Sequence, residues 1–260
     1  MKNLFDIKDN VVVITGGTGV LGRAIAIHLA DQGAKVVIMG RKAEVGNEIV
    51  KEIKENGGEA MFLVTDVMNR EILEQNLADI LAAYGRVDAL LNAAGGNMPG
   101  ATVAPTGTFF DLKIEEFQRV LDLNLTGTVL PTQVFLKPMV EQNKGAIVNF
   151  SSQAARDGGG PGASMYATAK AAVMCHTRSM AKELGPQGIR VNALAPGMIN
   201  TSFHDRFTKP EARENLHKTA PLRREGTAME IADLVCFLAC DESSYITGAS
   251  IDINGGVLFS

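Results

Sequence analysis

A glycine-rich loop lies between a run of β-branched residues and a helical pattern near the start of the chain. Residues 11–15 read Val-Val-Val-Ile-Thr, a continuous apolar run typical of a strand buried on both faces of a parallel sheet. The loop Gly16-Gly17-Thr18-Gly19-Val20-Leu21-Gly22 follows, and apolar residues then recur at helical spacing until Gly33. This order brings backbone amides to a helix N-terminus, where a pyrophosphate binds. The pattern predicts a dinucleotide site in an α/β sheet, with a ligand-free glycine turn as the alternative.

The alternation of strand and helix continues along the whole chain. Further strands are expected at residues 34–39, 60–64, 87–91, 146–150, 189–194 and 249–253, and helices at about 42–56, 69–84 and 228–239. A long apolar-periodic segment at about 112–142 contains Pro131 and Pro138, which remove backbone hydrogen bonds and are expected to kink it. We therefore predict one Rossmann-type α/β domain over residues 1–260, a doubly wound parallel sheet of about seven strands with helices on both faces.

Composition and charge exclude several classes of protein. The net charge of −4 argues against a nucleic-acid partner. No run approaches the ~20 apolar residues of a membrane span, and the N-terminus lacks the apolar run of a signal peptide, so we expect a cytoplasmic protein with no membrane partner. Three cysteines fit a reducing compartment. Cys236 and Cys240 are expected to pack in the core, and neither they nor the four histidines have metal-site spacing with further ligands, so no metal site is predicted.

The residues that follow each strand are the candidates for cofactor contact, because ligands bind at the carboxyl ends of the strands in an open α/β sheet. Gly40-Arg41-Lys42 follow the second strand, with no carboxylate to repel a 2′-phosphate. NADP(H) is therefore favoured, although Glu44 leaves NAD(H) possible and solvated surface charges are the alternative for Arg41 and Lys42. After the third strand, Asp66 is a candidate for adenine contact or for the N-cap of the next helix.

Tyr166 and Lys170 lie four residues apart in a helical stretch and therefore on one face of the helix. A free phenol, with a pKa near 10, is a poor proton donor at neutral pH. An ammonium beside it favours the phenolate, so Lys170 is expected to lower the pKa of Tyr166 by roughly 1–3 units. Ser151 and Ser152 follow the fifth strand, where a hydroxyl can hydrogen-bond the carbonyl oxygen that Tyr166 protonates. Taken alone, the Tyr-Lys spacing is common by chance.

Asn124 is an unusual residue inside the long helical segment, because Asn is a weak helix former. It is expected either to have a functional role or simply to face solvent.

Together these motifs resemble those of the short-chain dehydrogenase/reductase family over essentially the whole chain. They are the glycine loop from Thr15 to Gly22, Asn92-Ala93-Ala94-Gly95, Asn124, Ser152, Tyr166 with Lys170, Pro196-Gly197 with Ile199 and Thr201, Tyr245-Ile246-Thr247-Gly248 and Gly255-Gly256. The resemblance implies that Tyr166 is the acid/base and that Lys170 lowers its pKa and holds the nicotinamide ribose. It also implies that Ser152 polarises the carbonyl, that Asn124 fixes a water for proton relay, and that the protein is a homotetramer.

The cofactor-binding residues expected from the strand ends and from this resemblance form one set. They are Gly16, Thr18, Gly19, Val20, Leu21, Gly22, Arg41, Lys42, Asp66, Val67, Asn92, Ala93, Ala94, Gly95, Tyr166, Lys170, Pro196, Gly197, Ile199 and Thr201.

Two departures from the family pattern affect the site. The common form of the loop has its second glycine at the place of Val20, whereas this chain has Gly19. Ser152 precedes Tyr166 by 14 residues, one more than the family pattern, and the extra residue is expected in Gly158-Gly159-Gly160. Ser151 is the alternative hydroxyl.

The stretch from Asn92 to Pro99, with its long following loop and Pro131, resembles the branch that reduces sugar-acid ketones or aldehydes, such as fructuronate/mannonate oxidoreductases and reductases of unsaturated-uronate products. A small polyhydroxy carboxylate needs polar side chains and a cation in its pocket. The expected substrate residues are Asn97, Ser152, Gln153, Arg156, Tyr166, His204 and Arg206, with ordinary surface charges as the alternative. Residues 198–225 are polar and irregular, and are expected to contribute a mobile lid.

Two other functions remain open at this point. One is reduction of a 3-oxoacyl thioester or of ketones in general. The other, from a different class, is a non-catalytic dinucleotide-binding regulator or scaffold.

Overall fold

Seven parallel strands form one sheet in the computed structural model, which describes residues 5–103, 107–201 and 210–259. The strand order is β3-β2-β1-β4-β5-β6-β7. The strands are β1 (Val11–Thr15), β2 (Lys35–Gly40), β3 (Glu59–Val64), β4 (Ala89–Asn92), β5 (Gly145–Phe150), β6 (Ile189–Pro196) and β7 (Ser250–Ile253). The direction of winding reverses between β1 and β4, and a crevice for ligands opens beyond the carboxyl ends of strands at such a point.

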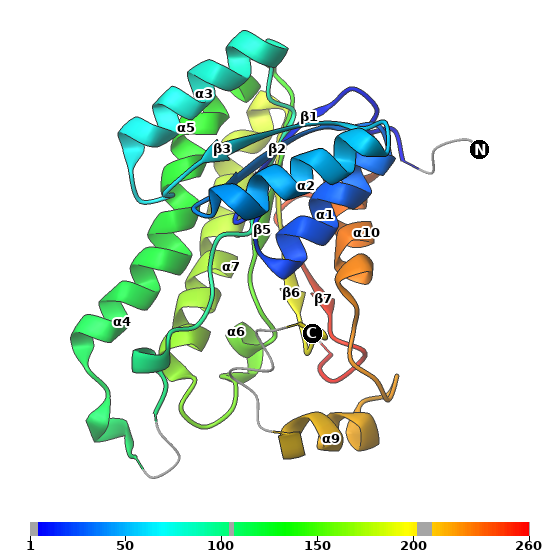
Figure 1. The fold of residues 1–260 in the computed structure, drawn as a ribbon. Helices are drawn as coiled ribbons and strands as arrows, with labels where there is room; N and C mark the ends of the chain where they lie inside the picture. The colour runs from blue at the N-terminus through cyan, green and yellow to red at the C-terminus, as the bar shows by residue number, and fades with distance from the viewer. Residues whose placement is uncertain (1–4, 104–106, 202–209, 260) are drawn as a thin grey trace.

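Helices cover both faces of this sheet (Figure 1). Helices α1 (Val20–Asp31), α2 (Ala43–Glu55) and α10 (Ala228–Ala239) cover one face, and α3 (Arg70–Tyr84), α5 (Gly127–Gln142) and α7 (Ser164–Leu184) cover the other. The short helix α6 (Ala154–Asp157) directly follows β5, so it marks the carboxyl edge of the sheet, and α9 (Pro210–Thr219) lies at the same end of the molecule in Figure 1. The predicted doubly wound α/β class is confirmed.

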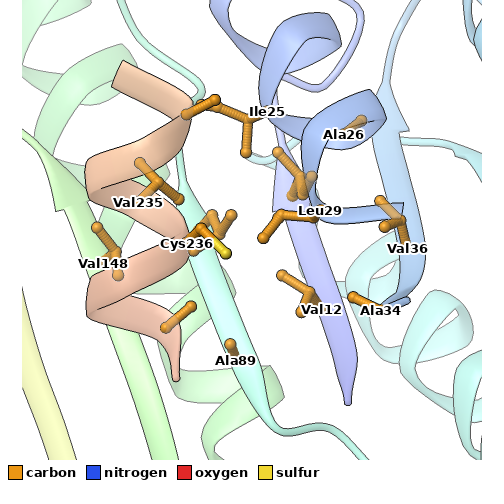
Figure 2. Close-up of a cluster of buried hydrophobic side chains, with 14 of the residues drawn as sticks. Val12, Ile25, Ala26, Leu29, Ala34, Val36, Ala89, Val148, Val235 and Cys236 are labelled. Carbon is orange, nitrogen blue, oxygen red and sulfur yellow. The ribbon is translucent and has the colours of Figure 1, made fainter. Parts of the chain in front are cut away.

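Strand β1 shows why residues 11–14 are all apolar. Val12 and Ile14 belong to the core beneath α1 and α10, whereas Val11 and Val13 belong to the core beneath α3, α5 and α7. Figure 2 shows the first of these cores, where Val12 and its strand neighbours meet Leu29 of α1. Burying an aliphatic side chain of this size contributes about 1.5–3 kcal/mol, so these two cores hold the strand ends in place for the site.

Cys236 and Cys240 lie in the first core and are buried, as the sequence indicated. Burial raises the pKa of each thiol to about 12. Within the described ranges, no three His, Cys, Asp or Glu side chains are grouped so that they could hold a metal ion.

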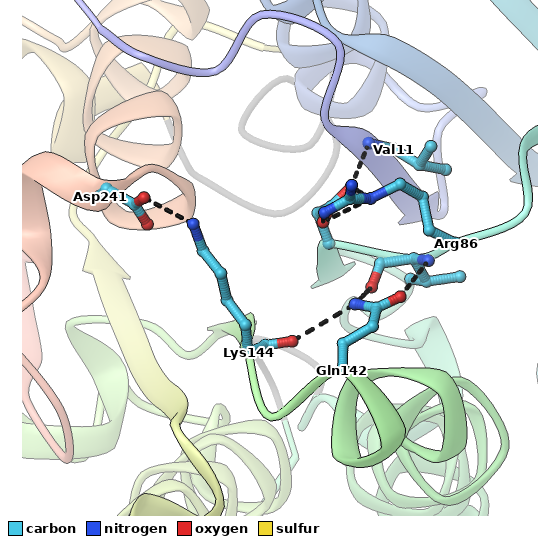
Figure 3. A network of polar contacts seen from close by, with 7 residues as sticks. Val11, Arg86, Gln142, Lys144 and Asp241 are labelled. Atoms are coloured by element: carbon cyan, nitrogen blue, oxygen red, sulfur yellow. Dashed lines mark hydrogen bonds and ion pairs between the residues drawn. The ribbon is translucent and has the colours of Figure 1, made fainter.

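Polar contacts fix the opposite, amino edge of the sheet (Figure 3). The buried carboxylate of Asp88 accepts a hydrogen bond of 2.8 Å from the Val11 backbone amide and also accepts from the Arg86 guanidinium. Lys144, just before β5, forms an ion pair of 2.6 Å with Asp241 after α10. These contacts join β1, the start of β4 and the segments next to β5 and α10 at the amino edge of the sheet.

The helical segment predicted at 112–142 is divided into three parts in the structure, at positions that the sequence did not indicate. Helix α4 (Ile114–Leu121) leads into a π-helical turn, η3 (Asp122–Thr126), and α5 follows with both prolines inside it. The short turns η1 (Pro99–Ala101) and η2 (Phe109–Asp111) precede α4. Residues 210–219 of the expected lid region form the regular helix α9, and a lid function for residues 198–225 stays a prediction. Among the described helices, none has the length and apolar character that a bilayer span requires.

Candidate active site

A cleft with a volume of about 280 Å³ opens at the carboxyl edge of the sheet. Fourteen of its lining residues were expected from the sequence, namely Gly16, Gly19, Val20, Leu21, Gly22, Ala93, Gly95, Ser152, Tyr166, Lys170, Pro196, Gly197, Ile199 and Thr201. Gly96, Phe150 and Ser151 complete the lining. Phe150 and Gly96 were not singled out, although each stands beside a predicted residue at a strand end, which was the available signal.

The glycine loop forms one wall of the cleft and fits a dinucleotide pyrophosphate. Gly16 has a φ of +67°, and a Cβ there would lie 2.8 Å from the Ala94 backbone nitrogen. A Cβ on Gly22 would lie 2.5 Å from the Gly16 carbonyl oxygen, so the start of α1 packs directly on the loop. The N-terminus of α1 has no side-chain cap and no acidic residue in its first turn. Its free amides and the positive end of its dipole therefore face the cleft and favour an anion.

The end of β2 lies beside this loop. A Cβ on Gly40 would lie 2.6 Å from the Thr18 hydroxyl oxygen, so the two segments are in close contact. Arg41 and Lys42 follow and are exposed, and neither forms an ion pair with a carboxylate in the described part of the chain. Both are therefore available to a phosphate.

The other predicted cofactor contacts lie outside the cleft lining. The carboxylate of Asp66 accepts a hydrogen bond from the Met68 amide, and the N-cap of α3 is Asn69, so the N-cap alternative for Asp66 is wrong. Val67 is buried near Gly127. The Ala94 amide donates to the Thr15 hydroxyl.

Asn92 has a structural position. Its buried amide nitrogen donates to the Thr132 hydroxyl at 3.0 Å and to the Asn149 amide oxygen at 2.9 Å, beneath the sheet. Its side chain thus joins β4 to α5 and β5. Contact between Asn92 and the cofactor stays a prediction.

Tyr166, Ser152 and Lys170 come together at the floor of the cleft. Tyr166 and Lys170 project from the first turns of α7, and the Lys170 ammonium lies 5.9 Å from the centre of the Tyr166 ring. The ammonium donates a hydrogen bond of 2.7 Å to the Phe150 carbonyl oxygen at the end of β5. The Ser152 hydroxyl is hydrogen-bonded to Tyr166, whereas the Ser151 hydroxyl donates to the Lys170 carbonyl oxygen at 2.8 Å. Ser152 is thus the hydroxyl placed beside the tyrosine.

The protonation of this group differs from the expectation. Burial raises the pKa of Tyr166 above its usual value of 10, and the hydrogen bond from Ser152 opposes that shift only in part. The expected lowering of the Tyr166 pKa by Lys170 is not found in the protein without cofactor, where burial outweighs the hydrogen bond with Ser152. Burial in turn lowers the pKa of Lys170 to about 8. At neutral pH Tyr166 is therefore a neutral acid, and Lys170 is mostly charged.

Asn124 lies in the π-helical turn and is completely buried, so the alternative that it faces solvent is wrong. Its side-chain amide accepts a hydrogen bond from the Gly96 amide at 3.0 Å and donates to the Gly96 carbonyl at 2.9 Å. A Cβ on Gly95 would lie 2.8 Å from the Asn124 oxygen and 3.1 Å from the Lys170 nitrogen. Asn124 therefore fixes the loop that passes over Lys170. A role in water binding stays a prediction.

The predicted substrate residues other than Arg156 divide into three groups. Ser152 and Tyr166 line the cleft. Asn97 and Gln153 do not line it. The Asn97 amide donates to the Thr102 hydroxyl within its own loop, and the Gln153 amide donates to the Asp157 carboxylate. His204 and Arg206 lie outside the described residues.

The prediction that Arg156 contacts the substrate is wrong, because its guanidinium is paired elsewhere. Its guanidinium donates to the Asp252 carboxylate at 2.6 Å and to the Ser250 carbonyl at 2.7 Å, and it does not line the cleft. Asp252 already neutralises it, so it is not available to a substrate carboxylate.

Comparisons with known proteins agree with this geometry. Residues 18–258 match the family described as Enoyl-(Acyl carrier protein) reductase. The 3-oxoacyl-[acyl-carrier-protein] reductase of Synechocystis sp. is 36% identical, covering 95% of this chain and 96% of that protein. The sorbitol-6-phosphate 2-dehydrogenase of Klebsiella pneumoniae is 34% identical and covers 98% of both. The xylitol dehydrogenase in the crystal structure with bound NAD⁺ is 30% identical in sequence to this chain. The two structures have a TM-score of 0.88, covering 96% of this chain and 100% of that one.

Fold, cleft and relatives together define an oxidoreductase that uses a nicotinamide dinucleotide. The chain belongs to the short-chain dehydrogenase/reductase family. These relatives are enzymes, which contradicts the alternative of a non-catalytic regulator.

Proposed function

We propose that the protein uses NADPH to reduce the carbonyl group of a small hydroxylated sugar acid, of the uronate or keto-uronate type, to an alcohol. The observation that carries the proposal is the hydroxyl pair of Tyr166 and Ser152, which lies in the same cleft as the uncapped N-terminus of α1.

The chain's own groups account for the proton. Neutral Tyr166 donates its proton to the carbonyl oxygen as hydride reaches the carbonyl carbon, and the Ser152 hydroxyl donates a hydrogen bond to the same oxygen. The bound cofactor supplies the hydride. Lys170, mostly charged below its pKa of about 8, stabilises the phenolate that Tyr166 leaves behind. Gly16, Gly19 and Gly22 with the α1 amides hold the pyrophosphate.

The preference for NADPH rests on Arg41 and Lys42. Both follow β2, where the adenosine ribose lies in this fold, and both are exposed without a carboxylate partner in the described ranges. A 2′-phosphate would give them a doubly charged partner.

The sugar-acid substrate is supported by the relatives named for sorbitol 6-phosphate and xylitol, which are polyhydroxylated. Several cations of α6, α9 and the segment after α9 are already paired with carboxylates. Arg156 bonds to Asp252, Arg213 to Glu225, Lys218 to Glu214 and Arg224 to Glu230. Arg206, which lies outside the described residues, is the cation that we propose for the substrate carboxylate.

We further propose a cytoplasmic homotetramer. The assembly is proposed from the family to which the chain belongs, and the exposed side chains of Phe110 and Tyr245 are candidates for burial in a subunit interface. Light scattering on the purified protein tests the assembly, and a monomer at micromolar concentration would contradict it.

The alternative function is reduction of a 3-oxoacyl thioester. It is favoured by the family description and by the Synechocystis relative, whose identity is similar to that of the sorbitol-6-phosphate enzyme.

One experiment separates these functions. Oxidation of NADPH and NADH is followed side by side with keto- and aldehydo-uronates, an acetoacetyl thioester and a neutral polyhydroxy ketone. We expect turnover with uronates, preferring NADPH. Arg206→Gln should raise the KM for the uronate by about tenfold and leave the KM for the neutral ketone within about twofold, as expected for loss of one charge-assisted pair. Turnover confined to the thioester would overturn the sugar-acid proposal.

A further inference from the structure

A small hydrophobic cluster, separate from the two cores of the sheet, lies beside the catalytic helix. We call it the satellite cluster, and its buried members are Ala101 of η1, Val120 of α4, and Met165 and Ala169 of α7. Three of the four side chains are completely buried, and Met165 is 5% exposed. Met98, Leu112, Phe117 and Leu121 pack around it. The inner end of the loop between β4 and α4 is therefore anchored by packing.

The two members on α7 occupy particular positions. Met165 immediately precedes Tyr166, and Ala169 immediately precedes Lys170. Successive residues on an α-helix are rotated by about 100°, so the satellite cluster supports the face of α7 next to the catalytic face. The small side chains of Ala101 and Ala169 leave room for close approach, and extra volume there would displace either the loop or the helix.

The same loop is also attached just before α7 begins. The Val103 amide donates to the Gly162 carbonyl oxygen at 3.3 Å. Gly162 has a φ of +90°, and a Cβ there would lie 3.0 Å from the Val103 carbonyl oxygen. The loop thus contacts the catalytic helix by packing within its first two turns and by a backbone hydrogen bond two residues before it.

We propose that Ala101, Val120 and Met165 are positioning residues that set where α7 presents Tyr166 and Lys170 to the substrate. Extra side-chain volume in the satellite cluster would move Tyr166 relative to Ser152, because Ser152 follows β5 and is not part of the cluster. The glycine loop that binds the pyrophosphate lies between β1 and α1, outside the cluster, so most of the predicted cofactor contacts stay in place. This inference rests on Tyr166 being the proton donor.

The test is Ala101→Leu, compared with Ala78→Leu, the same change at an exposed position of α3. A misplacement of about 1 Å costs on the order of 100-fold in rate, so a partial displacement should lower kcat by about tenfold or more. NADPH affinity, measured by fluorescence titration, should stay within about twofold. The pH profile of kcat should shift, because the hydrogen bond with Ser152 lowers the pKa of Tyr166 and the distance between these two residues changes. Adding Met165→Ala to Ala101→Leu removes volume from the same cluster and should restore part of kcat.

The outcomes separate this inference from the proposed function. If Ala101→Leu fails to fold, the milder Ala101→Val and the single Met165→Ala decide in its place. The inference is overturned if these variants fold and keep the wild-type kcat and pH profile, or if Ala101→Leu lowers kcat and NADPH affinity equally. Tyr166→Phe is measured in parallel, and turnover retained by that variant overturns the proposed function itself.

Discussion

Replacing Lys170 with Met should change how the stability of the protein without cofactor depends on pH. Lys170 is 5% exposed, and its pKa is about 8 in the fold against 10.5 ordinarily. Because the folded pKa is the lower one, the folded protein binds fewer protons than the unfolded chain between these two values. The charged Lys170 therefore lowers the free energy of unfolding by its full amount below pH 8, and this destabilisation diminishes as the pH rises toward 10.5.

The size of the effect follows from the shift. One pKa unit corresponds to about 1.4 kcal/mol, so a charged Lys170 costs the fold about 3 kcal/mol at pH 7. Integrating between the two pKa values, wild type should gain about 2 kcal/mol relative to Lys170→Met on going from pH 7 to pH 9.5. The hydrogen bond from Lys170 to Phe150 offsets part of the cost at every pH, so the pH dependence of the difference is the quantity to measure.

The assay is urea unfolding of wild type and Lys170→Met at half-unit steps from pH 7 to pH 9.5. The difference between the two proteins cancels titrations that they share, including those of Cys236 and Cys240, which act in the opposite direction because their pKa values are raised. Lys182→Met, the same change at an exposed position of α7, is the control. A difference between wild type and Lys170→Met that stays constant across this range would refute the argument that Lys170 is held as a buried charge.

Three further predictions concern the site. Gly22→Ala places a Cβ 2.5 Å from the Gly16 carbonyl oxygen and should lower the Tm and weaken NADPH binding by about tenfold in fluorescence titrations, whereas Gly160→Ala, where a Cβ meets nothing within 4 Å, should change neither. Replacing Arg41 and Lys42 together with Ala should raise the KM for NADPH by about tenfold and leave the KM for NADH within about twofold in steady-state assays, and equal losses for both cofactors would contradict the 2′-phosphate assignment. Asn124→Ala removes the side chain that pairs with the amide and carbonyl of half-buried Gly96 and should lower the free energy of unfolding by about 1–2 kcal/mol in urea titrations, with a fall in kcat, and unchanged stability would show that Gly96 does not depend on Asn124.

The glycine loop and the alternation of strands and helices were sufficient to predict the fold class. Helices cover both faces of β1, so each of its consecutive residues from Val11 to Ile14 must be apolar. A run of neighbouring residues is therefore enough to indicate the burial of this strand. The same local logic located most of the cleft, because the ends of parallel strands meet at one edge of the sheet. The sequence also narrowed the carbonyl-binding hydroxyl to Ser151 or Ser152.

Ion pairs, hydrogen bonds and pKa values that depend on residues distant in the sequence could be determined only from the tertiary structure. Arg156 is a plausible substrate cation by position alone, yet Asp252, 96 residues away, neutralises it. Asn is a weak helix former, so the sequence left the role of Asn124 open. Only the fold shows that its side-chain amide pairs with the backbone of Gly96. The spacing of Tyr166 and Lys170 placed them on one helix face, but burial determines the direction in which both pKa values shift, with the Ser152 hydrogen bond opposing the shift of Tyr166. Periodicity and strand ends are properties of neighbouring residues and are carried by the sequence, whereas charge pairing and desolvation depend on which distant groups the fold brings within a few ångströms.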